Sequence, residues 1–154
     1  MTISRQQLLT FMRQEAYAVQ ASVSVGGAPQ AALVGVVVTD RFEVFFDTLS
    51  TSRKAANLRH DPAVALVMGP TDAASVRTVQ CEGFADEPSG DDLERLLELY
   101  FARFPDGRTR RSLPDIAYVR VNLQWVRYSD FSIEPPEIVE FQRGDLDRSR
   151  KTPQ

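Results

Sequence analysis

The chain has 154 residues, with 18 basic and 21 acidic side chains, a formal net charge of −3 and 43% hydrophobic residues. This length and composition predict one domain with a proper hydrophobic core. The mixed charge argues against a nucleic-acid partner and against a polybasic membrane segment. We also expect no signal peptide and no membrane-spanning helix, because no apolar run is long enough. The single cysteine, Cys81, excludes an internal disulfide and fits a reducing, cytoplasmic location.

The first elements predicted are a helix and three strands. Ser4 and Gln7 have capping-box spacing before a helix with an apolar stripe. The alternating, valine-rich segment 17–25 predicts a strand, and GGAP after it predicts a turn. The nearly apolar segment 30–38 predicts a second strand that is buried on both faces. A third strand is predicted over 42–48, after the short turn TDR.

A second helix and two more strands follow. The helix is predicted over 53–60 and ends before the sequence DP, because the residue before a proline disfavours helix. Strands are predicted over 63–69 and 76–87, separated by the loop PTDAAS. Gly83 interrupts the second of these strands, which predicts a bulge there.

The C-terminal part predicts a helix and a long strand. Ser89 and Asp92 have capping-box spacing before an apolar stripe that ends at a proline. Residues 106–115 read as a polar loop, and 116–131 as a long strand followed by a short edge strand over 137–141. One face of the long strand is predicted to carry Val119, Val121, Leu123 and Trp125.

Together these elements predict a mainly β fold with inserted helices. Antiparallel strands joined by tight turns favour a closed or partly open barrel of six to seven strands. We predict a single domain over residues 1–142 and a disordered tail over 143–154. The apolar second and long strands offer more apolar surface than one barrel interior can bury, which predicts a homodimer.

The segment TLSTSRK predicts an anion site at the start of the second helix. Ser50, Thr51 or Ser52 can cap this helix, which leaves its first backbone N–H groups pointing outward. Arg53 can form a bidentate pair with phosphate, and Lys54 adds a second positive charge. An ordinary capped helix with two solvated cations explains the same residues, and the chemistry of this segment alone does not choose between the two.

The longer stretch VFFDT…SRKAANLRHDPAVALV resembles the segment that marks the pyridoxamine 5'-phosphate oxidase-like, FMN-binding split-barrel superfamily. The order of elements from Tyr17 to Asp130 is also similar to that of the family. The resemblance implies a split β-barrel homodimer in which each FMN lies between the two subunits. The activity it implies is hydride or electron transfer between the flavin and a small molecule.

The resemblance also implies which residues hold the cofactor. Arg53 and Lys54 would grip the 5'-phosphate beside Ser52, and Asp47 and Thr48 at the end of the preceding strand would contact the flavin. An earlier strand would line the ring system, largely through its backbone, and a polar residue early in the fifth strand would approach the pyrimidine edge. The residues expected for these two roles are Ala32, Leu33 and Val34, and Thr78 or Gln80.

Departures from the family leave the substrate open. Val37 stands where the true oxidases have a substrate-binding lysine, and Ser129 where they have a tryptophan near the flavin. The segment FSIEPPEIVEF lacks the basic Arg–Leu–His group that binds the pyridoxal ring. We therefore expect a related protein and not the vitamin oxidase itself, and no side chain is identified as catalytic.

Two alternatives use the same fold. A deazaflavin-dependent reductase would use the same phosphate anchor, with Arg108–Arg111 meeting a longer anionic tail. A non-enzymatic flavin- or haem-binding module is the second alternative, and haem ligation would rest on the only histidine, His60. A lone histidine also excludes a histidine-cluster metal site, so no metal is expected.

Overall fold

The computed structural model describes residues 2–69 and 76–147 as a mainly β chain, and the predicted loop PTDAAS lies outside these ranges. In the described ranges, the strands are β1 (Tyr17–Val23), β2 (Pro29–Gly35), β3 (Val37–Val38), β4 (Glu43–Leu49), β5 (Ala63–Met68), β6 (Arg77–Asp86), β7 (Ile116–Asp130) and β8 (Glu137–Gln142). The helices are α1 (Arg5–Gln14), α2 (Arg53–His60), α3 (Gly90–Arg103), α4 (Gly107–Arg110) and α5 (Arg143–Leu146). Among these helices, none combines the length and the hydropathy needed to cross a membrane.

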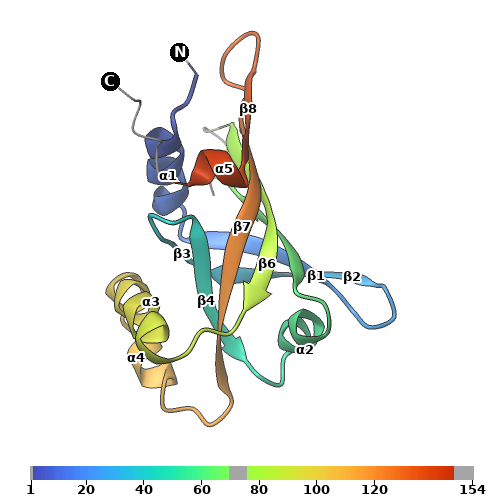
Figure 1. The fold of residues 1–154 in the computed structure, drawn as a ribbon, viewed down its shortest axis with the longest axis vertical. Helices are drawn as coiled ribbons and strands as arrows, with labels where there is room; N and C mark the ends of the chain where they lie inside the picture. Colours follow the sequence, from blue (N-terminus) through green and yellow to red (C-terminus); the bar gives the residue numbers. More distant parts are fainter. Residues whose placement is uncertain (1, 70–75, 148–154) are drawn as a thin grey trace.

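The strands form one curled antiparallel sheet in the order β2-β1-β5-β6-β7-β4-β3, with β8 paired to β7 (Figure 1). Its two terminal strands, β2 and β3, are separated in the chain only by Val36. One short segment therefore supplies both ends of the sheet, and the right-handed twist of the strands accommodates the curl. This confirms the mainly β, antiparallel prediction as an open half-barrel. The homodimer stays a prediction.

Helix α1 packs one apolar face against the concave side of the sheet, as predicted. Leu8 and Met12 are fully buried, and Leu9 is nearly so. The predicted capping box is present, with Ser4 accepting from the backbone of Gln7 and the Gln7 side chain accepting from the backbone of Ser4. Figure 1 shows α1 beside α5 at one end of the molecule and α2 at the other.

The predicted second strand, 30–38, differs from the structure in two ways. It is broken at Val36 into β2 and β3, which pair with different neighbours. In the single chain only one face of β2 is buried, and Leu33 on its other face is 67% exposed. That other face lies on the outside of the curled sheet, so its burial would need a second chain, as in the predicted homodimer.

The predicted bulge at Gly83 is confirmed, and it changes the faces of β7. The register passes from the pair Glu82–Trp125 to the pair Gly83–Leu123, so Gln124 on β7 has no partner. An extra residue in one strand reverses the alternation of its side chains beyond that point. Trp125 therefore leaves the buried face, and its predicted place beside Leu123 is wrong.

Helix α3 begins at the predicted position but without the predicted capping box. Ser89 is the N-cap residue, yet its side chain makes no cap hydrogen bond. Asp92 instead pairs with Arg95 and Arg120, and both of these arginines also contact the buried carboxylate of Glu43. Burial raises the pKa of Glu43, but the hydrogen bonds and charges of Arg95 and its other partners outweigh this and hold the pKa below its ordinary value.

Two segments predicted as irregular contain short helices. The polar loop 106–115 includes α4, which packs beside α3. The predicted disordered tail, 143–154, begins with α5, because Leu146 is fully buried in the core and Arg143 donates to the backbone carbonyl of Leu123. Residues 148–154 lie outside the described residues.

Replacing Gly83 by alanine should destabilise the fold by about 1–3 kcal/mol, the usual cost of overpacking. An added Cβ would overlap the backbone carbonyl oxygen of Asn122, which cannot rotate away as a side chain could. Gly26→Ala is the control, because its Cβ would meet only Ser24 at 3.9 Å. Urea unfolding of the three proteins checks this, and equal midpoints for wild type and Gly83→Ala would contradict it.

Candidate functional site

The start of helix α2 carries a small network of hydroxyl groups and a cation. Ser52 is the N-cap residue, and its Oγ accepts from the backbone N–H of Ala55 at 3.2 Å. The same Oγ lies 3.0 Å from Oγ1 of Thr48, and Nζ of Lys54 donates to that Oγ1 at 3.1 Å. The structure thus brings together three predicted site residues: Thr48, Ser52 and Lys54.

Arg53 adds a second cation at the same helix end. Its side chain is exposed, and among the described residues it has no hydrogen bond or ion pair. The first turn of α2 contains no acidic side chain. The positive end of the helix dipole, its free N–H groups and two cations therefore face solvent without a compensating anion.

A cavity of about 210 Å³ opens beside this helix end. Side chains of β1, β2 and α2 line it, so the predicted Ala32 lies in the same cavity as Arg53 and Lys54. The lining residues are Gln20, Ser22, Gln30, Ala31, Ala32, Arg53 and Lys54.

The buried carboxamide of Asn57 fixes α2 against this cavity. Its Nδ2 donates to Oγ of Ser22 at 3.1 Å and to Oε1 of Gln30 at 2.9 Å. Asn57 is 5% exposed and Ser22 is 2% exposed, so these bonds are shielded from water. The sequence analysis missed this residue. The sequence could have pointed to Asn57, because its amide lies on the same helix face as Ala55 and Leu58, which are buried.

Gln20 is a second polar side chain that the sequence analysis missed. It is 1% exposed, and its Oε1 has no hydrogen-bond partner in the part of the chain that the structure describes. The alternation of side chains along the strand could have predicted its burial, because Gln20 shares the inner face of β1 with Ala18 and Ser22.

The side chain of Asp47 points away from the cavity. Successive residues of a strand face opposite sides, and Asp47 precedes Thr48 on β4. Its carboxylate accepts from the hydroxyl of Tyr100 at 3.0 Å and from Nε of Arg110 at 2.8 Å. Burial, and then the charge of Asp47, raise the pKa of Tyr100, so the phenol stays protonated and donates. The Asp47 side chain is therefore held by Tyr100 and Arg110 and does not line the cavity.

The other arginines of the predicted loop are also engaged. Arg108 lies over the ring of Phe101, 5.3 Å from its centroid. Arg111 pairs with Glu94 across to α3. Both contacts, like the ion pair of Arg110, hold α4 in place, so these cations serve the fold.

The remaining predicted residues lie on other surfaces. Val34 belongs to the core, and Leu33 lies on the outer face of the sheet. A row of paired positions, Leu33, Val19, Val67 and Gln80, crosses four neighbouring strands on that face. Three strand spacings separate its ends by roughly 14 Å. Gln80 and its neighbour in phase, Thr78, therefore do not line the cavity of the same chain.

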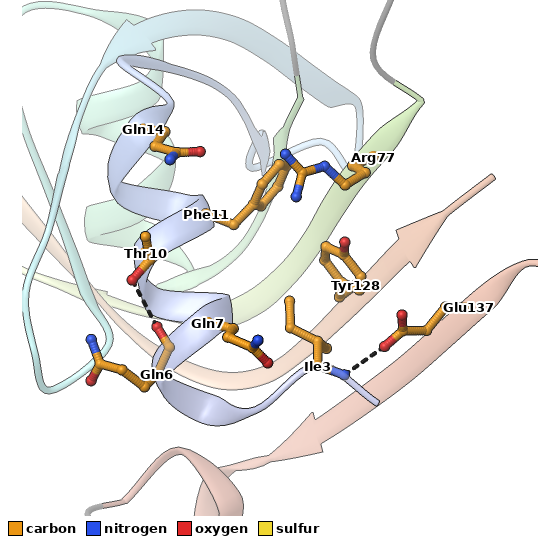
Figure 2. Close-up of a pocket in the computed structure, with 9 residues that line it drawn as sticks. All are labelled: Ile3, Gln6, Gln7, Thr10, Phe11, Gln14, Arg77, Tyr128 and Glu137. Atoms are coloured by element: carbon orange, nitrogen blue, oxygen red, sulfur yellow. Dashed lines mark hydrogen bonds between the residues drawn. The ribbon is translucent and has the colours of Figure 1, made fainter. Parts of the chain in front are cut away.

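A larger hollow of about 380 Å³ lies at the other end of the molecule, between α1 and strands β6 to β8 (Figure 2). Arg77 lies over the ring of Phe11, 4.8 Å from its centroid, and Glu137 accepts from the backbone of Ile3 at 2.5 Å. None of the predicted site residues lines this hollow, and its charged groups already have partners.

Among the described residues, no histidine, cysteine, aspartate or glutamate lines the cavity at α2, and Lys54 is a titratable amine in its lining. In the described ranges, no group of three or more histidine, cysteine, aspartate or glutamate residues could hold a metal. His60 is exposed at the opposite end of α2, roughly 10 Å from Arg53 along the helix axis. Cys81 is buried, and burial raises the pKa of its thiol, so it remains an unreactive core residue. Arg53 and Lys54 are the charged side chains that line the cavity, so its lining is positively charged.

Replacing Asn57 by alanine should lower the free energy of unfolding by about 1–3 kcal/mol, because Ser22 and Gln30 lose a buried partner. Asn122→Ala is a matched control, since Asn122 makes only a 3.4 Å exposed contact with Asp86. Its effect should stay within about 0.5 kcal/mol. Denaturant titration measures both, and an equal effect of the two substitutions would show that Asn57 does not anchor α2.

Comparisons with known proteins agree with this fold. The sequence profile described as pyridoxamine 5'-phosphate oxidase matches residues 4–130. A heme binding protein from Mycobacterium smegmatis has a TM-score of 0.82 at 14% identity, over 95% of this chain and 60% of that one. HutZ, a heme storage protein from Vibrio cholerae, has a TM-score of 0.66 at 17% identity, over 91% and 95% of the two chains. A putative pyridoxamine 5'-phosphate oxidase from Listeria innocua has a TM-score of 0.63 at 16% identity, over 80% and 96%.

These likenesses are all below 25% identity and show the fold alone. The chain spans only 60% of the mycobacterial protein and 55% of a similar protein of unknown function from Agrobacterium tumefaciens. No curated protein sequence matches the chain. Since the family profile covers residues 4–130 and the neighbours share the fold, the chain belongs to the pyridoxamine 5'-phosphate oxidase-like split-barrel family.

Proposed function

We propose that this chain binds FMN through the start of helix α2 and is a flavin-dependent oxidoreductase acting on a small molecule. The observation that carries the proposal is the exposed Arg53, which has no partner among the described residues, beside Lys54 and the hydroxyls of Thr48 and Ser52. A phosphate dianion accepts hydrogen bonds from all of these groups and from the free N–H groups of the helix. Bound flavin would supply the redox chemistry, and this chain would supply binding and orientation.

The size of the cavity fits one end of such a cofactor. Sites for whole drug-sized ligands measure roughly 300–1,000 Å³, and this cavity measures about 210 Å³. It therefore suits the phosphate and the adjoining chain, while the ring system would continue along β2. Because β2 ends the sheet order and pairs only with β1, its other edge offers backbone groups to a ligand. This supports the expected contacts with Ala32, Leu33 and Val34.

A homodimer would complete the site. The outer face of β2, β1 and β5 is apolar, and Phe84 on β6 extends it, with Val19 41%, Val67 48% and Phe84 55% exposed in the single chain. Exposed apolar patches of this kind commonly mark interfaces. Because Gln80 lies roughly 14 Å across the sheet from Leu33, the expected contact of Thr78 or Gln80 with the ring would come from the second subunit. We therefore propose two equivalent sites, each lined by both chains.

Haem binding is the second candidate, because the similar structures include a heme binding protein and a heme storage protein. His60 would be the only histidine ligand, and it lies at the opposite end of α2 from the cations. The deazaflavin alternative loses its expected support, since the side chains of Arg108, Arg110 and Arg111 contact the protein itself. The absorption spectrum of the purified protein, alone and with added FMN, haem or deazaflavin, separates the three.

Arg53→Ala should weaken FMN binding by about 1.5–3 kcal/mol, the range for a hydrogen bond to a charged group. The same substitution should weaken riboflavin binding only slightly, because riboflavin lacks the phosphate. Arg59→Ala is the matched control, because Arg59 lies on the same helix but pairs with Glu87. Fluorescence titration of both ligands into the three proteins measures this. Equal losses of affinity for FMN and riboflavin in Arg53→Ala would show that Arg53 does not bind the phosphate.

Val67→Glu should raise the dissociation constant of the dimer at least tenfold, because burying an unpaired carboxylate costs more than the 1.4 kcal/mol that a factor of ten represents. Val67 is half exposed in one chain, so its own subunit can accept the charge. FMN should oppose dissociation, since a ligand shared by two subunits stabilises their complex. The control is Val25→Glu, in a turn where Val25 is 76% exposed.

Sedimentation over a dilution series, with and without FMN, measures the dissociation constant of the dimer for each protein. A monomer that binds FMN at full strength would contradict the shared site.

A further inference from the structure

We draw no further inference here: the strongest candidate, the apolar hollow of about 380 Å³ beside Phe84 on the outer face of β1, β5 and β6, lies on the face already assigned to the proposed dimer, and nothing in the structure shows what covers it.

Discussion

The buried carboxamide of Asn57 ties helix α2 to both strands of the β1–β2 hairpin, and the candidate site depends on this tie. Its bonds to Ser22 and Gln30 fix the helix relative to the strands that form the cavity wall. An eight-residue helix is too short to be stable alone, so its direction comes from such contacts. Asn57, one turn beyond the N-terminal end of α2, therefore helps to hold that end against the cavity.

Of the two cations at that helix end, Lys54 donates to Thr48, but Arg53 has no hydrogen bond or ion pair in the fold among the described residues. Elsewhere, arginines hold elements together: Arg95 and Arg120 join α3 to the sheet through Glu43, and Arg110 joins α4 to β4 through Asp47. Arg53 joins nothing among the described residues, and it lies where the helix dipole disfavours a cation. A bound dianion would reverse that cost, which is why the pair of cations is better explained by a ligand than by stability.

The elements that depend on local chemistry were predictable from the sequence, and those that depend on distant partners were not. The Ser4 capping box needs only residues three apart, and the helix from Arg53 to His60 ends at a local proline signal. The orientation of Trp125 depends on a bulge opposite Gly83, about forty residues earlier in the chain. The apolar sequence of β2 does not show which of its faces lies on the outside of the curled sheet.

The residues of the candidate site also fall into those that the sequence predicted and those that it did not. The helix cap, the two cations and Thr48 were visible as a motif, and the structure gathers them. The side chain of Asp47 was assigned by resemblance alone, and its ion pair with Arg110, 63 residues away, turns it elsewhere. Gln20 and Asn57 carry no local signal stronger than a polar residue on a buried face. Because burying an amide is costly unless it is paired, such a residue points to a partner that only the folded chain reveals, as Ser22 and Gln30 are for Asn57.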